Sequence, residues 1–231
     1  MRGPVAFIGE YPLGFKCDSS GFFSKISNNQ KFKTMGTRHI TMVVADGQTR
    51  IAQYGQWDGY PEGQGLTVLQ FLRKPEVQLP AFKKRVTELR WKTKEDDKIL
   101  EHKQDWKYTH FHISRDCGGE ILEMVMFGSV GEKRLAQGIQ EKTNVEFVRD
   151  DRGFEKESLF CEFAYVVDLD KETFEVYRGY NKTPLEKTER FFQEQPDENG
   201  YYPVKHWATF QLNNLPTPEE FIRTFQEEED E

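Results

Sequence analysis

The sequence contains few cysteines and no long apolar run. Cys17, Cys117 and Cys161 are widely spaced, without a CxxC pair. This spacing predicts no disulfide framework and fits a reducing compartment. No segment approaches the ~20 apolar residues that cross a bilayer, and the apolar run 5–8 is too short for a secretory signal. We therefore expect a soluble cytoplasmic protein, able to reach the nucleus by diffusion, with no membrane partner.

The sequence also lacks an excess of positive charge. The formal net charge is -7, and an acidic domain repels phosphate backbones, so binding to duplex nucleic acid is disfavoured. Residues 227–231 are all acidic and predict a solvated tail. A basic cluster is expected to be a solvated helix face; it comprises Lys83, Lys84, Arg85 and Arg90.

Aromatic residues compensate for the scarcity of aliphatic ones. The chain has 19 Phe, 9 Tyr and 4 Trp, and each large ring can bury roughly 150–250 Å². A packed core is therefore expected over residues 35–226, as a single α+β domain. Residues 1–34 are rich in Gly, Ser, Asn and Lys without periodicity. We interpret them as a disordered or non-native N-terminal extension, with Met35 as an alternative start.

The distribution of apolar residues predicts hairpins interspersed with helices. Strands 40–45 and 49–54 flank Asp46-Gly47, a dipeptide typical of the type I′ turn. Further strands are expected over 108–113, 160–167, 173–177 and 204–212, and helices over 66–74, 79–91, 120–127 and 218–226. Thr217 and Glu220 form a candidate capping box for the last helix. Because hairpins imply antiparallel pairing, we predict an α+β fold whose antiparallel sheet is built from hairpins with packed helices.

A loop at residues 55–65 is the most unusual segment. It contains four glycines and one proline in eleven residues. Gly63 and Gly65, with the residue between them, would present backbone amides to an anion at the start of the next helix. Trp57 and Tyr60 could stack on a base or sugar, and Asp58 could act as a catalytic base. The P-loop lysine and the GxGxxG spacing are absent. The alternative is a structural turn with both rings packed on the core.

Arg38 and His39 are further candidate site residues, at the start of the first strand. Consecutive strand residues face opposite sides of a sheet, so only one of them can point into a site near the loop. Arg38 suits a phosphate or a carboxylate, with a rim salt bridge as the alternative. His39 is the second candidate catalytic residue, beside Asp58.

Three other groups of residues are candidates for a metal site or a nucleophile. His110 and His112, with His102 or Asp116, do not complete a metal-ligand set, so no metal is predicted. Cys117 stands at a predicted helix start, where a thiolate is stabilised, but an inert buried thiol is the alternative. Cleavage before Gly36 or Thr37 would create an N-terminal nucleophile, although no sequence signal indicates cleavage.

The two motifs Met35-Gly-Thr-Arg-His39 and Gln53-Tyr-Gly-Gln-Trp-Asp-Gly-Tyr-Pro61, the latter followed by Gly63-Gln-Gly65, resemble a family. It comprises uncharacterised proteins of fungi and bacteriophages that begin near an MGTR element and carry a Q-[WF]-D-G-Y-P-x-G-x-G loop. The blocks 163–168 and 174–178 are similar to a second recurring block of that group. The resemblance covers roughly residues 35–215 and implies Met35 as the ancestral start. It implies no activity and no catalytic residue.

Two functions follow from the sequence. The first is binding or processing of a small anionic ligand, a nucleotide or phosphorylated metabolite, at the 55–65 loop, with no cofactor identified. The second is a non-enzymatic protein–protein interaction module. The first predicts a pocket near Gly63 on which Asp58, Arg38 and His39 converge. The second predicts a flat aromatic patch without convergent polar groups.

Overall fold

The computed structural model describes residues 36–96, 117–128 and 144–226. The chain divides between Thr34 and Met35 into two units, and every described residue belongs to the second. The expected extension, the acidic tail, the strand predicted at 108–113 and the three histidines considered as metal ligands lie outside the described residues. The expectations for those segments remain predictions.

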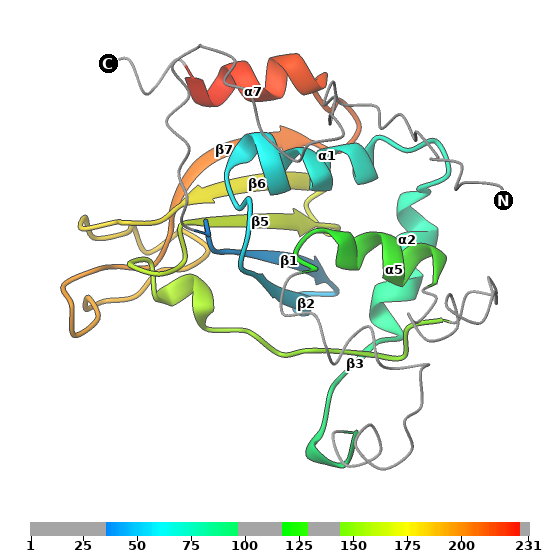
Figure 1. Cartoon of the computed structure of the whole chain (residues 1–231), viewed down its shortest axis with the longest axis horizontal. Coiled ribbons are helices and arrows are strands. Elements are labelled where there is room, and N and C mark those ends of the chain that lie inside the picture. The colour runs from blue at the N-terminus through cyan, green and yellow to red at the C-terminus, as the bar shows by residue number, and fades with distance from the viewer. Residues whose placement is uncertain (1–35, 97–116, 129–143, 227–231) are drawn as a thin grey trace, which may run out of the picture. The chain divides into compact units, whose positions relative to one another are not determined.

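A five-stranded sheet forms the centre of the described domain (Figure 1). Its order is β2-β1-β5-β6-β7, and the α+β class predicted from the sequence is confirmed. The strands are β1 (His39–Ala45), β2 (Gln48–Gly55), β5 (Phe163–Asp168), β6 (Thr173–Arg178) and β7 (Lys205–Gln211). The two predicted hairpins are β1–β2 and β5–β6, both antiparallel. Asp46 and Gly47 both have positive φ, as the type I′ turn requires.

The sheet is mixed rather than wholly antiparallel, because the two hairpins join through a parallel pair. β1 runs parallel to β5, with His39 opposite Phe163 and Val44 opposite Asp168. Hairpin signals in a sequence identify local pairs, but they do not say how one hairpin pairs with another. As a result β1 and β5 both begin at the same end of the sheet, where β2 and β6 end.

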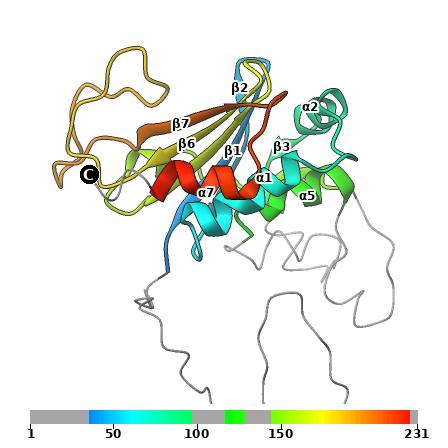
Figure 2. The same ribbon diagram turned by 90° about the horizontal axis from the view of Figure 1, so that it is seen from above.

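In the described part of the chain, the α-helices that pack against the sheet lie on one face, and they bury the larger core against it (Figure 2). They are α1 (Leu66–Leu72), α2 (Leu79–Thr87), α5 (Glu120–Phe127) and α7 (Pro218–Gln226). Val43, Val167 and Val176 point toward these helices, where Phe82 and Phe221 are fully buried. A smaller core lies on the opposite face and includes Ile40, Met42, Ala164, Val166 and Tyr177. The alternation along each strand therefore separates two buried environments.

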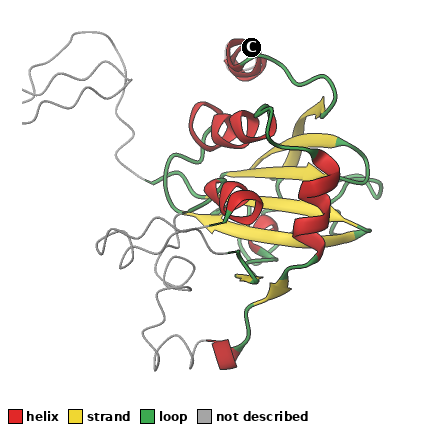
Figure 3. Ribbon diagram, turned by 90° about the vertical axis from the view of Figure 1, so that its right-hand side faces the viewer, coloured by secondary structure: helices red, strands yellow, loops and turns green. Residues whose placement is uncertain are grey.

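The helix predicted over 79–91 extends beyond the C-terminal end of the observed helix. Helix α2 stops at Thr87, and Arg90–Trp91 forms a short strand, β3, that pairs in parallel with β4 (Phe147–Val148). Figure 3 shows this small ladder apart from the main sheet. The capping box of α7 is confirmed: the Thr217 amide donates to Glu220 Oε2 at 2.8 Å, and the Glu220 amide donates to Thr217 Oγ1 at 3.2 Å. Within the described ranges, no helix is long and apolar enough to cross a membrane.

Candidate functional site

The backbone amides of Gly63, Gln64 and Gly65 donate hydrogen bonds within the protein. Residues 61–65 wind into one π-helical turn that precedes α1. The Gly63 amide donates to the Tyr60 carbonyl at 3.0 Å, and the Gly65 amide donates to the same oxygen at 3.5 Å. The Gln64 amide donates to the Asp58 carbonyl at 2.8 Å. The expectation that these amides are free to hold an anion is therefore wrong.

The glycines of this loop are required by close packing. A Cβ added at Gly63 would lie 2.1 Å from the Asp58 carbonyl oxygen. One added at Gly65 would lie 3.0 Å from the ring of Phe221 in α7. The other two loop glycines, Gly55 and Gly59, both contact the side chain of His39. The glycine content of the loop is thus explained by contacts within the domain, without a ligand.

His39 lies in a cage of three glycines. A Cβ would be 2.1 Å from His39 Cε1 if added at Gly55, 3.0 Å from Nδ1 if added at Gly59, and 2.3 Å from Nε2 if added at Gly118. Gly118 comes from the turn before α5 and has a φ of +39°. Real Cβ atoms are not found at the shorter two separations, so only glycine allows the backbone to approach the imidazole this closely. We call His39, Gly55, Gly59 and Gly118 the glycine cage.

The imidazole in the glycine cage is neutral and has no hydrogen-bond partner among the described residues. His39 is 0% exposed, and neither Nδ1 nor Nε2 makes a hydrogen bond of acceptable geometry. Burial lowers its pKa from 6.5 to about 4, although the nearby Thr37 carbonyl acts in the opposite direction. A buried polar group without a partner costs on the order of 1–3 kcal/mol, so its presence needs an explanation.

Other buried polar side chains continue from His39 along the same face of the sheet. Thr41 is 0% exposed, and its hydroxyl also lacks a partner. The Tyr165 hydroxyl donates to the Gly59 carbonyl at 2.7 Å and so supports the roof of the cage. Cys117 is 4% exposed, and burial raises the pKa of its thiol to about 12. The inert alternative for Cys117 is therefore supported, because the thiolate is the nucleophilic form.

Arg38 does not converge with His39. Its side chain points to the opposite side of the sheet from His39, as strand alternation predicts. Its guanidinium lies 5.1 Å from the centre of the Phe160 ring. Arg38 Nε is 3.7 Å from Glu162 Oε1, which also accepts the Arg38 amide at 3.2 Å. The rim salt bridge considered for this residue is present.

Asp58, Trp57 and Tyr60 point outward from the loop. The exposed fractions are 55% for Trp57 and 39% for Tyr60, so the alternative in which both rings pack into the core is wrong. The Tyr60 hydroxyl donates to Asp58 Oδ1 at 3.2 Å. None of these three groups reaches the buried ring of His39, so the two residues predicted to be catalytic, Asp58 and His39, do not form one constellation.

Four exposed aromatic side chains gather at one end of the sheet. In the described part of the chain, the exposed large hydrophobic residues are Trp57, Tyr60, Phe160 and Tyr180. They lie in the segments that follow β2, precede β5 and follow β6, and the strand register places all three segments at the same end. We call these four residues the aromatic end. The sequence indicated the first two, whereas Phe160 and Tyr180 carry no local motif.

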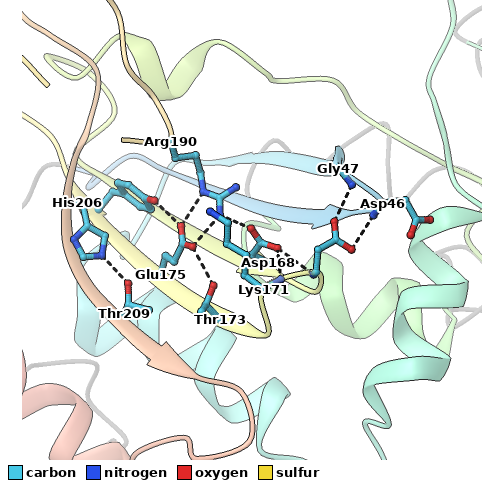
Figure 4. Close-up of polar contacts among 11 residues, drawn as sticks. Asp46, Gly47, Asp168, Lys171, Thr173, Glu175, Arg190, His206 and Thr209 are labelled. Carbon is cyan, nitrogen blue, oxygen red and sulfur yellow. Dashed lines mark hydrogen bonds and ion pairs between the residues drawn. The ribbon is translucent and has the colours of Figure 1, made fainter. Parts of the chain in front are cut away.

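A second polar cluster, on the face of the sheet opposite to the helices, was missed by sequence reasoning. Arg190 lies between two buried carboxylates (Figure 4). Its Nε donates to Glu175 Oε2 at 2.8 Å, and its Nη2 donates to Asp168 Oδ2 at 2.5 Å. Tyr177 and Thr173 complete the cluster by donating to Glu175. We call these five residues the arginine cluster.

The arginine cluster is internally saturated. Burial alone would raise the pKa of Glu175, but the hydrogen bonds from Arg190 and Tyr177 outweigh it and hold the pKa at about 2. Asp168 also accepts the amides of Asp170 and Lys171 in the β5–β6 turn. Beside the cluster is a groove of about 730 Å³, lined by Met42, Val166, Arg190 and other residues. Because Arg190 is already neutralised by two carboxylates, we interpret the cluster as an anchor for the 180–203 segment.

No group of three or more potential metal ligands exists among the described residues. The set at residues 102–116 considered from the sequence lies outside them. Comparisons with family models, with curated proteins and with solved structures found no match to this chain.

Proposed function

We propose that this domain is a binding module that recognises a basic segment of a partner protein through its aromatic end. The observation that carries the proposal is the gathering, within the described residues, of all four exposed large hydrophobic side chains at one end of the sheet. Tryptophan and tyrosine are the residues most enriched at the energetic centres of protein interfaces. Isolated exposed apolar residues need no explanation, but their concentration at one end does.

The polar groups of the loop support binding over catalysis. The amides of residues 63–65 are occupied, Arg38 is paired with Glu162 and His39 is enclosed. An enzyme of the kind expected from the sequence needs these groups to converge on one pocket. A surface that only binds a partner does not, so the interaction alternative fits the arrangement better.

Backbone strain coincides with the aromatic end. Among the residues that the structure describes, four other than glycine have positive φ. Asp46 and Glu172 occupy hairpin turns, where such a conformation is ordinary, but Asp58 (φ 53°) and Tyr180 (φ 55°) lie outside the hairpins. Strained backbone costs of order 1–3 kcal/mol per residue and clusters at functional sites. Both residues belong to, or lie beside, the aromatic end.

A cationic side chain suits the exposed rings of Trp57 and Tyr60. Asp58 stands between the two rings in sequence, and the charges of Asp58 and Glu62, after partial burial, raise the pKa of Tyr60. The surface around Tyr60 is therefore negative. Arg and Lys bind aromatic faces with about 0.5–2 kcal/mol of cation–π energy, and the net charge of -7 steers a basic partner toward the domain.

The proposal is tested by fluorescence anisotropy with labelled peptides. The probes are a peptide of alternating Arg and Gly and a matched peptide with Glu in place of Arg. We expect the Arg peptide to bind in a salt-dependent manner and the Glu peptide not to bind. Trp57→Ala should weaken binding about tenfold, which is about 1.4 kcal/mol. Asp58→Asn should weaken binding less than Trp57→Ala and should reduce its salt dependence, because a negative charge is removed. The loop should keep its conformation, because Asn tolerates the same positive φ.

The matched control is Lys171→Ala, an exposed residue in the β5–β6 turn at the opposite end of the sheet. It should bind the Arg peptide like the parent protein. Equal affinity for both peptides, or full affinity in Trp57→Ala and Tyr60→Ala, would exclude the proposal. Binding of neutral oligosaccharides in place of the Arg peptide, lost in Trp57→Ala, would reassign the aromatic end to sugar recognition.

A further inference from the structure

The loop that carries Trp57, Asp58 and Tyr60 is built directly over a buried imidazole. Gly55 and Gly59, on either side of Trp57 and Asp58, are two of the three glycines in contact with His39. The Gly59 amide donates to the Thr37 carbonyl at 3.0 Å, and the Gly59 carbonyl accepts the Tyr165 hydroxyl. Any movement of the imidazole must therefore be transmitted to this loop.

The glycine cage cannot accommodate a protonated ring as it stands. An imidazolium carries two N–H donors and needs an acceptor for each. The nearest described acceptors, the Thr37 carbonyl and Gln64 Oε1, each accept a backbone amide, and neither accepts a hydrogen bond of acceptable geometry from the ring nitrogens of His39. A buried charge without acceptors is far more costly than an exposed one.

No described group facing His39 can balance a positive charge on the ring. The titratable side chains of the packed elements are Tyr165 of β5 and Cys117 before α5, and burial raises the pKa of both, so they stay neutral in acid. The charged residues in the chain segments around the cage reach solvent; they are Arg38, Asp58, Glu62 and Glu120. Asp168 of β5 is buried, but it lies on the opposite face of the sheet and is paired with Arg190. Within the described residues, His39 is thus the buried group of this region that becomes charged in mild acid.

The geometry points to an acid-triggered release of the loop: protonation of His39 displaces Gly55–Gly59 from the sheet and disassembles the aromatic end. The ring gains solvent as an acceptor only when the roof formed by Gly55 and Gly59 moves away. The effect on partner binding rests on the proposed function, but the release itself does not. Because the pKa of His39 is about 4 in the folded cage and 6.5 when the ring is free, protonation favours the released loop increasingly as the pH falls from 6.5 toward 4.

Fluorine NMR of the protein labelled with 5-fluorotryptophan tests this without any partner. Trp57 reports on the loop, and Trp207 in β7, half-buried against Phe225, reports on the rest of the domain. As the pH falls from 7 to 4, the Trp57 resonance should shift and narrow as the loop becomes mobile. The Trp207 resonance should stay in place until the domain unfolds at lower pH. Substitution of each tryptophan by Phe assigns the resonances.

Two histidine variants separate the contribution of the ring from general acid effects. His39→Asn is neutral and smaller, and it should abolish the Trp57 transition. His206→Gln removes a histidine that is exposed and bonded to Thr209, and it should leave the transition unchanged. If His39→Asn does not fold, nitrogen-15 shifts of the His39 ring must show protonation at the pH where Trp57 moves.

The inference is overturned if Trp57 and Trp207 change together, if the transition persists in His39→Asn, or if the ring protonates while Trp57 stays in place. A failure of peptide binding at pH 7 would overturn the proposed function alone. The two hypotheses can therefore fail independently.

Discussion

The two faces of the sheet bury polar groups in opposite ways. In the arginine cluster, every carboxylate oxygen of Glu175 and Asp168 accepts a hydrogen bond, and the guanidinium of Arg190 lies between them. In the glycine cage on the other face, neither nitrogen of His39 has a partner. The first arrangement stabilises one conformation of the 180–203 segment. The second places an imidazole without hydrogen-bond partners, which destabilises the folded state, directly under the 55–65 loop.

This difference separates structural from functional polarity. Saturated polar networks rigidify a fold, whereas buried groups without partners are uncommon in native proteins and need a reason. The glycine cage lies beneath the 55–65 loop of the aromatic end, and the arginine cluster lies beside a groove in which Arg190 is already paired with two carboxylates. The comparison favours the aromatic end, rather than the groove, as the proposed binding surface of the domain.

Removing Arg190 should have the largest effect on stability. Arg190→Met keeps much of the side-chain volume but leaves Glu175 and Asp168 buried without their counter-ion. Breaking a buried ion pair from one side costs about 3–5 kcal/mol, so the urea midpoint should fall sharply. The control is Arg152→Met, whose ion pair with Asp150 is partly exposed and whose guanidinium lies 4.5 Å from the centre of the Trp91 ring; it should cost about 1–2 kcal/mol. Equal losses in the two variants would contradict the distinction between a buried anchor and a surface pair.

Filling the glycine cage should have the next largest effect. Gly55→Ala places a Cβ 2.1 Å from His39 Cε1, and overpacking of this kind costs about 1–3 kcal/mol. Addition of His39→Ala removes the clash, so the double variant should be more stable than the sum of the two single changes predicts. Urea unfolding of the four proteins in the cycle measures this coupling.

Gly153→Ala provides the control for the cage. No atom lies within 4 Å of its added Cβ, and its φ is +102°. Its cost therefore comes from backbone strain alone and should be insensitive to His39→Ala. Coupling of His39 to Gly153 as strong as its coupling to Gly55 would show that the effect is not local to the cage.

The sequence predicts the local features of this fold better than its long-range ones. The Asp46-Gly47 turn and the Thr217–Glu220 capping box are encoded within four residues, and both are present. The parallel pairing of β1 with β5 depends on segments far apart in the chain, and no local pattern reports it. Arg190 lies in a segment without periodicity, so its contact with Asp168 could not be anticipated.

The candidate site shows the same limit in a different form. The glycines of the 55–65 loop are predicted from the sequence to bring the backbone close to an anionic ligand. Their partner was misjudged, because glycine reports the closeness of an approach and not what is approached. The partner of Gly55 and Gly59 is His39, and the third wall of the cage, Gly118, comes from a distant turn. Composition alone cannot bring these residues together.

The smallest predicted effect compares two buried threonines on opposite faces of the sheet. Thr41 is fully buried with no partner for its hydroxyl, whereas the Thr173 hydroxyl donates to Glu175 Oε1 at 3.0 Å. Replacement by Val keeps the shape and the β-branch in both cases. Thr41→Val should leave the free energy of unfolding unchanged or raise it by up to about 1 kcal/mol, because an unpartnered polar group is removed.

Thr173→Val should lower the free energy of unfolding by about 1–2 kcal/mol, because a buried carboxylate loses a donor. Urea unfolding at pH 7 resolves the two changes, since they differ in sign and not only in size. If Thr41→Val destabilised the domain as much as Thr173→Val does, the Thr41 hydroxyl would have a partner. The polar groups on the helix-covered face would then have hydrogen-bond partners like those of the arginine cluster. The absence of a partner for His39 would in that case need to be tested again in the same way.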